Sequence, residues 1–394
     1  CVYRHPASQR TMTNTTHIYL DHSATSAIRP EVLEGMMPWL TSQFGNPSSV
    51  YRAGREARHA LESSRARIAT LLGVGPAEIT FTSGGSESNG TVIASHTNPM
   101  RPGVITSSIE HEATLEPVRQ HDIHTIIKPD SSGRVTKGML SSLGEERLKN
   151  TGLASFMLVN NELGSINPIV ELSDFLHEHG IMIHTDAAQA VRTIDLVPIA
   201  KNADYLSMSG HKFGAPKGSG ILMVKVGTPY VPLIRGGGQE QDRRAGTENV
   251  AAAVGLAVGL ELAIAERESL VAQCLAFREM LVNGLTNELG DSLRINSSLN
   301  DSSPHILNVA IVNSDGVGLD GEMLILGLDI EGLAASAGSA CSSGTIKTSH
   351  VLDGIGVASD VARGALRLSM GPQTTSKEIN HAVEIVSRVA KRMM

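Results

Sequence analysis

Two side chains that could act together in catalysis each follow a strand-like run of the sequence. Lys212 ends the run Ser-Gly-His-Lys, and Asp186 begins the run Asp-Ala-Ala-Gln. A lysine amine condenses with aldehydes, and a carboxylate beside a pyridine nitrogen keeps that nitrogen protonated. Either run alone would be weak evidence, because such a lysine usually lies in a solvated loop and such an aspartate can simply begin a helix. Their joint occurrence predicts an enzyme that binds pyridoxal phosphate.

A glycine-rich turn could hold the phosphate of this cofactor. The run Thr-Ser-Gly-Gly-Ser-Glu-Ser at residues 82–88 joins an expected strand to an expected helix. Its glycines allow a tight turn, and the free N–H groups at the start of the helix attract an anion. Gly85 offers such an amide, and Ser86 adds a hydroxyl. Most turns of this composition bind nothing, so the prediction depends on the neighbouring residues.

Other polar residues also follow strand-like runs. His111 could stack on the pyridine ring or transfer protons, although a lone loop histidine is more often structural. Asn161 and Gln189 carry amides that could bond a ring oxygen of the cofactor or the substrate. Ser209 and His211 flank the lysine and could reach phosphate oxygens. Together with the turn, these groups form the candidate cofactor site.

Strand and helix patterns alternate from residue 56 onward. Helical spacing occurs at 56–72, 86–95 and 171–179, and short apolar runs predict strands at 79–82, 104–107, 155–159, 181–185, 204–208 and 220–224. This alternation predicts an α/β fold with a mostly parallel sheet covered by helices. Ligands bind such a sheet at the carboxyl ends of its strands, which is where the candidate residues lie.

After an Ala- and Gly-rich helix at 250–265, whose small residues suit close packing between subunits, the pattern changes. Strands are expected at 307–312 and 365–370, and helices at 321–328 and 376–391. We therefore expect a large cofactor-binding domain over 23–265 and a smaller α+β domain over 266–394. Residues 1–22 form an N-terminal segment that combines an extension with part of the smaller domain. We assign no function to the extension.

Composition excludes several classes of function. The 394 residues carry a formal net charge of −7 and no basic run, which argues against a nucleic acid as a directly gripped ligand. No apolar stretch is long enough to span a membrane, and no residue pattern suggests a metal site. The three cysteines are Cys1, Cys274 and Cys341, too few for a disulfide framework. A cytoplasmic enzyme is expected.

Nine motifs occur in the order found in cysteine desulfurases of the NifS and IscS type. They stand at residues 20–25 (LDHSAT), 44–49 (FGNPSS), 82–88 (TSGGSES), 110–111 (EH), 160–164 (NNELG), 186–189 (DAAQ), 209–212 (SGHK), 236–240 (GGGQE) and 244–247 (RAGT). From Tyr19 to its end the chain resembles this group, which belongs to the class V aminotransferases. The resemblance implies fold type I of the pyridoxal-phosphate enzymes, with a large and a small domain.

The resemblance also implies a role for each candidate residue. Lys212 is expected to form the Schiff base with the cofactor, and Asp186 to pair with the pyridinium nitrogen. The ring would be stacked by His111 and its substituents held by Asn161 and Gln189. The residues implied to hold the phosphate are Gly85, Ser86, Ser209, His211 and, from the other subunit of a homodimer, Thr247.

Arg367 resembles the family arginine that binds the substrate carboxylate, and a fork-shaped guanidinium suits that task. Asn161 would also contact the substrate.

Cys341 lies in a stretch of small residues, Ala-Ser-Ala-Gly-Ser-Ala-Cys-Ser-Ser-Gly, with almost nothing to pack. A structural cysteine normally has bulky apolar neighbours, as Cys274 does. The thiol of Cys341 is better explained as a nucleophile on a mobile segment. We expect the mobility to extend over residues 338–345. The resemblance identifies Cys341 as the residue that carries the persulfide.

The resulting expectation is the conversion of L-cysteine to L-alanine, with transfer of the Cys341 persulfide sulfur to an acceptor protein. Iron–sulfur cluster assembly, tRNA thiolation and DNA phosphorothioation all draw on such enzymes. A selenocysteine lyase or an aminotransferase on the same fold is the nearest alternative. A non-catalytic partner protein that kept the fold is a more distant one, because the lysine, aspartate and cysteine positions are all occupied.

Overall fold

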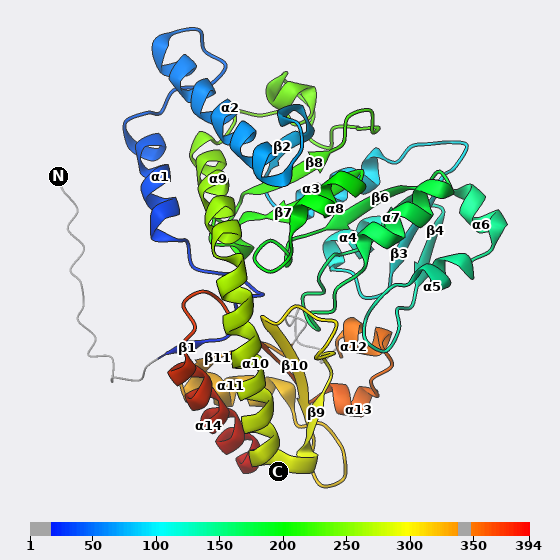
Figure 1. Ribbon diagram of the computed structural model, residues 1–394, viewed down its shortest axis with the longest axis vertical. Helices are drawn as coiled ribbons and strands as arrows, with labels where there is room; N and C mark the ends of the chain where they lie inside the picture. The colour runs from blue at the N-terminus through cyan, green and yellow to red at the C-terminus, as the bar shows by residue number, and fades with distance from the viewer. Residues whose placement is uncertain (1–16, 338–347) are drawn as a thin grey trace.

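The computed structural model describes residues 17–337 and 348–394. Among these residues, seven strands form the central sheet in the order β2-β8-β7-β6-β5-β3-β4 (Figure 1). Only β8 runs antiparallel to its neighbours, so the predicted α/β fold with a mostly parallel sheet is confirmed. The strands are β2 (Ile79–Thr82), β3 (Gly103–Ser107), β4 (His124–Ile127), β5 (Thr151–Ser155), β6 (Met182–Asp186), β7 (Tyr205–Ser209) and β8 (Gly220–Val224).

Side chains alternate across this sheet and meet helices on both faces. In β8, Ile221 and Met223 join the larger core, whereas Leu222 and Val224 join the core on the opposite face. The larger core also receives side chains from α2 (Arg52–Leu72), α7 (Ile169–Glu178), α8 (Leu196–Asn202) and α9 (Val250–Ala265). The opposite face is covered by α3 (Gly85–Ser95) and α4 (Glu112–Arg119). Burial on both faces explains why both sets of alternating side chains in β8 are apolar.

A second core lies at the other end of the molecule (Figure 1). It is built by α10 (Arg267–Leu289), α11 (Gly321–Ile330), α14 (Ser376–Met393) and an antiparallel sheet of β9 (Leu293–Ile295), β10 (Ile306–Ile311) and β12 (Ala365–Ser369). The amino end joins this core, because β1 (Ile18–Tyr19) pairs in parallel with β11 (Leu333–Ala334). The domain bounds given above remain a prediction.

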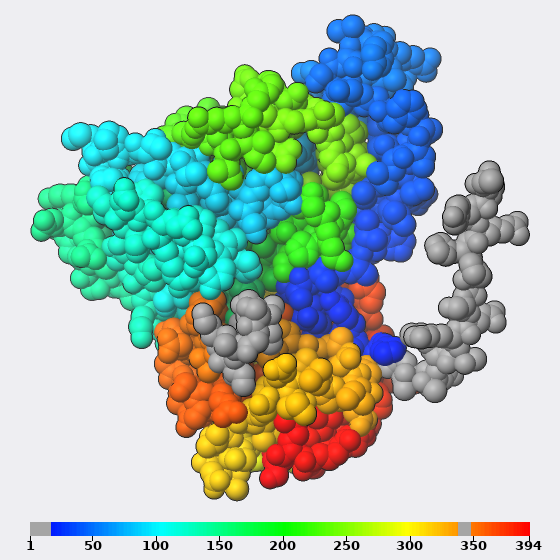
Figure 2. Space-filling model, turned by 180° about the vertical axis from the view of Figure 1, so that it is seen from behind, coloured from blue at the N-terminus to red at the C-terminus, as the bar shows by residue number. Residues whose placement is uncertain are grey.

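The chain that follows β1 lies between the two cores. In Figure 2 it is the blue surface between the green part of the sheet unit and the yellow unit below. Within the described ranges, no helix is both long and apolar enough to cross a membrane.

Two expectations about these elements were wrong. The strand expected at 155–159 lies at Thr151–Ser155. The more apolar run after it stays buried, and its N–H groups at Phe156 and Leu158 still donate to backbone oxygens of β6. The small residues of α9 serve packing within the chain. A Cβ at Gly255 would stand 2.7 Å from Met36 Sδ, and one at Gly259 would stand 3.1 Å from the Ala215 side chain. Small residues at 255 and 259 therefore admit neighbours from the same subunit.

Candidate active site

Lys212 and Asp186 lie at the carboxyl ends of adjacent strands. Asp186 ends β6, and Lys212 closes the short 3-10 turn η2 (Gly210–Lys212) that follows β7. The Lys212 Nζ donates hydrogen bonds to the carbonyl oxygens of Ser23 at 2.6 Å and Ala24 at 2.8 Å. Neither partner is charged. The amine therefore lies between the two cores. Among the described residues, no carboxylate forms a direct ion pair with it.

The segment after β1 connects several of the predicted residues. The Ser23 carbonyl oxygen that accepts from Lys212 also accepts a hydrogen bond from Gln189 Nε2 at 2.9 Å. Two residues on, Thr25 Oγ1 lies 3.1 Å from Nδ1 of His211. These contacts were not predicted from the sequence, although the LDHSAT motif that contains Ser23 and Thr25 was one of the nine.

Asp186 is buried, and both of its carboxylate oxygens accept hydrogen bonds. Oδ1 accepts from the N–H of Ala188 at 2.9 Å, and Oδ2 accepts from Asn89 Nδ2 at 2.7 Å. The first contact is local, as expected for an aspartate at a strand end. The second comes from α3, and Asn89 was not among the predicted residues.

The predicted phosphate turn has the expected geometry. Gly84 is the N-cap of α3 and has a φ of 154°, a conformation that L-residues rarely adopt. A Cβ at Gly85 would lie 3.6 Å from the Ser209 side chain, so the end of β7 lies against this turn. The structure thus brings together Gly85, Ser86 and Ser209, with Ser86 exposed. Free N–H groups at the start of an eleven-residue helix suit an anion there.

His111 is the N-cap of α4. Its Nδ1 accepts a hydrogen bond from the N–H of Ala113 at 3.0 Å, which leaves Nε2 as the ring nitrogen that can carry a proton. Desolvation of the ring lowers its pKa, the nearby charge of Asp186 opposes this shift, and Lys212 adds to it. His111 is therefore a neutral imidazole near both of the principal groups at neutral pH.

His211 is also neutral at that pH. Burial lowers its pKa to about 4, and the positive charges of Lys212 and Lys217 act in the same direction.

Arg367 on β12 points from the second core toward the site. Its Nη2 donates to Asp21 Oδ1 at 2.8 Å, and its Nη1 donates to the backbone oxygen of Asn161 at 2.8 Å. Its Nε is buried and, within residues 17–337 and 348–394, has no hydrogen-bond partner. A buried guanidinium with an unused donor suits a carboxylate ligand. Asn161 and Arg367, which were both predicted to contact the substrate, are thus neighbours. The contact between them is made by the backbone of Asn161.

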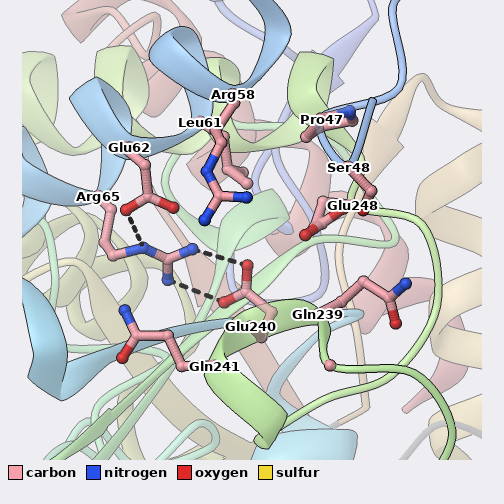
Figure 3. Close-up of a pocket in the computed structure, with 11 residues that line it drawn as sticks. Pro47, Ser48, Arg58, Leu61, Glu62, Arg65, Gln239, Glu240, Gln241 and Glu248 are labelled. Atoms are coloured by element: carbon pink, nitrogen blue, oxygen red, sulfur yellow. Dashed lines mark hydrogen bonds and ion pairs between the residues drawn. The ribbon is translucent and has the colours of Figure 1, made fainter. Parts of the chain in front are cut away.

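Thr247 is exposed, and the loop before it is fixed by a buried ion pair (Figure 3). The guanidinium of Arg65 donates to both carboxylate oxygens of Glu240, each at 2.8 Å, beside a hollow of about 380 Å³. Left-handed φ values of 48°, 57° and 64° follow at Glu240, Gln241 and Asp242. Such a conformation costs about 1–3 kcal/mol for each non-glycine residue, so the bidentate pair imposes the shape of the loop.

Cys341 lies outside the described residues, but the chain on both sides of residues 338–347 contacts the site. Before this segment, the backbone N–H of Arg367 donates to the carbonyl oxygen of Ser336 at 2.6 Å. After it, Ser349 Oγ donates to the buried carboxylate of Glu162 at 2.5 Å, next to Asn161. Both attachments therefore lie beside predicted substrate-binding residues.

Cys274 is buried on α10, as predicted for a structural cysteine. Burial raises the pKa of its thiol to about 12, which leaves almost no thiolate at neutral pH.

The comparison with known sequences agrees with this geometry. The aminotransferase class-V family matches residues 18–381. The chain belongs to that family. It is 38% identical to the cysteine desulfurase IscS of Dictyoglomus turgidum over 385 residues, which cover 95% of each chain.

Two solved structures extend the comparison. A NifS-like protein superposes with a TM-score of 0.87 at 33% identity, covering 95% of this chain and all of its own. The structure of SspA in complex with cysteine gives a TM-score of 0.76 at 32% identity, covering 91% of this chain and 100% of that one. The predicted family resemblance and fold type are thereby confirmed.

The lowered pKa of Lys212 predicts how the rate of cofactor capture depends on pH. Burial lowers its pKa to about 8, with a further contribution from the charge of Arg367 against the opposing charges of Asp186 and Asp21. Only the neutral amine attacks an aldehyde, so the rate at which the cofactor-free protein captures pyridoxal phosphate should rise with pH through about 8. Stopped-flow absorbance measures this rate. Arg367→Gln should move the inflection to higher pH, and an inflection near 10 in the unmodified protein would contradict the assignment.

Proposed function

We propose that this protein is a pyridoxal-phosphate-dependent cysteine desulfurase, which converts L-cysteine to L-alanine and carries the sulfur as a persulfide on Cys341. The observation that supports this most is the site at the ends of β6 and β7. There a lysine amine of lowered pKa lies near a buried, hydrogen-bonded aspartate. The chain is also 38% identical to a cysteine desulfurase over 95% of its length.

The described residues fit this cofactor. The turn at Gly84 offers the free amides at the start of α3 to a phosphate, and among the described residues no carboxylate is bonded directly to the Lys212 amine. Asp186 would hold the pyridinium nitrogen and His111 would stack on the ring. The remaining ligands would be Asn161, Gln189, Gly85, Ser86, Ser209 and His211. When bound, the cofactor supplies an electron sink that makes the substrate Cα–H bond acidic.

The chain's own groups then bind the substrate and move its protons. The Arg367 guanidinium holds the carboxylate of L-cysteine, using the Nε that has no protein partner. Lys212 Nζ takes the proton from Cα, and its lowered pKa suits a general base near neutral pH. His111 Nε2 would transfer a second proton within the site.

The sulfur transfer requires a thiolate at Cys341. Its Sγ attacks the sulfur of the bound cysteine, so a sulfur–sulfur bond forms while the Cβ–S bond breaks. The electron pair of that bond returns to the substrate Cβ, which takes up a proton, and return of the Cα proton from Lys212 completes L-alanine. The persulfide then passes its outer sulfur to an acceptor protein in iron–sulfur assembly, tRNA thiolation or DNA phosphorothioation. A reducing compartment such as the cytoplasm suits this thiol chemistry.

Product analysis tests the proposed reaction. We expect one alanine for each sulfur released from L-cysteine, with no requirement for a keto acid. Faster alanine formation from selenocysteine would identify a selenocysteine lyase instead. An absolute requirement for a keto acid, with Cys341 dispensable, would identify an aminotransferase. A purified protein without the colour of the cofactor would support the non-catalytic alternative.

We also propose that the enzyme is a homodimer in which Thr247 reaches the phosphate site of the partner subunit. The exposure of Thr247 on a rigidly held loop supports this. So does an exposed apolar stripe on and beyond α1 (Pro30–Thr41), formed by Leu33, Met37, Leu40 and Phe44.

A mixed dimer of one Lys212→Ala chain and one Thr247→Ala chain tests the shared site. The site with the intact lysine would receive its threonine from the other chain, so one site for each dimer should bind cofactor normally. The Thr247→Ala homodimer should bind it more weakly, because a hydrogen bond to a charged group contributes about 1.5–3 kcal/mol. Equilibrium titration measures both. Equally weak binding by the mixed dimer would show that Thr247 serves its own subunit.

A further inference from the structure

Asn89 joins three parts of the site that the proposed function assigns to different portions of the cofactor. It lies in α3, and its side chain is fully buried. Its Nδ2 donates one hydrogen bond to Asp186 Oδ2 at 2.7 Å and another to Thr114 Oγ1 at 3.1 Å. Thr114 is a buried residue of α4, the helix that His111 caps. One amide group thus bridges α3, α4 and the end of β6.

These links connect groups whose separation matters for one rigid ligand. Within the phosphate turn at residues 82–88, α3 begins at Gly85, which lies four residues and so about one helical turn before Asn89. Because α3 is stiff, the bond from Asn89 fixes Asp186 relative to that turn. The bond to Thr114 fixes the first turn of α4, which His111 caps. A phosphate, a pyridinium nitrogen and a ring face belong to one covalent molecule, so the groups that hold them need fixed distances.

The hydrogen bond also fixes the direction in which the Asp186 carboxylate faces. A hydrogen bond between a carboxylate and a pyridinium nitrogen depends on that direction. The other oxygen is already occupied by the N–H of Ala188 at 2.9 Å. Without Asn89, the carboxylate would lose its only side-chain donor among the described residues, and its Oδ2 would be free to turn away.

A further observation separates this role from ordinary packing. The Asn89 Oδ1 is buried and has no hydrogen-bond partner among the residues that the structure describes. An unpaired buried oxygen is unfavourable, and a leucine of similar size would avoid it. The Asn89 side chain thus leaves its oxygen unpaired while both hydrogens of its nitrogen form hydrogen bonds. This asymmetry indicates that the nitrogen is the functional part of the amide.

We infer that Asn89 is a positioning residue, which holds Asp186 aligned toward the cofactor nitrogen while coupling it to the phosphate turn and to the helix that His111 caps. The inference rests on the proposed function, since it assumes that the cofactor binds here. It goes beyond it by assigning a role to a residue outside the cofactor's own contacts.

The test measures the state of the bound cofactor rather than turnover. Pyridoxal phosphate labelled with ¹⁵N in its ring is titrated into the cofactor-free dimer of the unmodified protein and of Asn89→Leu, Asn89→Asp and Thr91→Val. Thr91→Val is the matched control, because Thr91 is a buried residue of the same helix whose hydroxyl bonds only to the Glu87 carbonyl. Thermal unfolding of each cofactor-free protein verifies folding.

We expect the unmodified protein and Thr91→Val to bind with equal affinity and to show a protonated ring nitrogen. Asn89→Leu should bind the cofactor roughly tenfold more weakly or worse, and its nitrogen signal should move toward the unprotonated value. Asn89→Asp should resemble the unmodified protein at low pH, where its new carboxylic acid can donate to Asp186. It should resemble Asn89→Leu at higher pH, where two adjacent carboxylates repel each other.

Two results would overturn the inference, and they differ in what else they overturn. If the unmodified protein binds the cofactor and Asn89→Leu matches Thr91→Val in affinity and nitrogen signal, Asn89 only packs and the proposed function stands. If Asn89→Leu does not fold, an Asn89→Asp variant whose nitrogen signal does not change with pH leads to the same conclusion. If the unmodified protein itself binds no cofactor, the proposed function and the inference both fail.

Discussion

Replacement of Lys212 by alanine should abolish desulfurase activity and remove the visible absorbance of the bound cofactor. The amine is both the expected covalent tether and the group that takes the Cα proton, and a general base alone contributes about 10²–10⁴-fold to a rate. Its partners in the protein are two backbone carbonyls, so the fold should survive the change. Alanine formation and the absorbance spectrum, measured on the same sample, check both parts.

Lys212→Arg is the matched control for charge. A guanidinium keeps the positive charge and much of the length of the side chain, but it stays protonated and does not condense with the aldehyde of the cofactor. It should be as inactive as Lys212→Ala. Turnover by either variant within tenfold of the unmodified enzyme would exclude Lys212 as the catalytic lysine.

Replacement of Cys341 by serine should separate cofactor chemistry from sulfur transfer. The variant should keep the cofactor colour and still respond spectroscopically to L-cysteine, because Lys212, Asp186 and Arg367 are untouched. It should release no alanine, because a hydroxyl cannot accept the substrate sulfur. Alanine quantification over single and multiple turnovers measures the loss, expected to be close to complete.

Cys274→Ser provides the control for the loss of a thiol. Cys274 is buried and its thiol has a raised pKa, so this variant should keep full turnover for each folded molecule while losing some stability. Substantial sulfur release by Cys341→Ser, with L-cysteine as the sole thiol, would exclude the persulfide assignment.

The parts of the site that sequence could predict are those carried by strand ends. Asp186 and Lys212 each follow an apolar strand, and parallel strands place their carboxyl ends at one edge of a sheet. The turn at Gly84 was predictable for a similar reason, since it follows another strand end, although its composition alone would not have been enough.

The contacts that sequence could not predict are made by side chains far apart in the chain. Asn89 lies 97 positions before the aspartate it bonds, and nothing in its own surroundings indicates that partner. The role of the Ser23 carbonyl was equally hidden, because any residue type supplies a carbonyl oxygen. The strand at Thr151–Ser155 was placed too late because the buried run at 156–159 is more apolar than the strand itself and keeps backbone hydrogen bonds to β6.

The central claim is that Cys341 receives the sulfur of L-cysteine, and mass spectrometry of the Cys341 peptide tests it most directly. The enzyme is mixed with L-cysteine labelled with heavy sulfur, without any other thiol, and alkylated at once. The proposed mechanism predicts one labelled sulfur added to Cys341, none added to Cys274, and an equal amount of alanine. Alanine formed with labelled sulfide in solution, while Cys341 stays free of label at every time point, would contradict it.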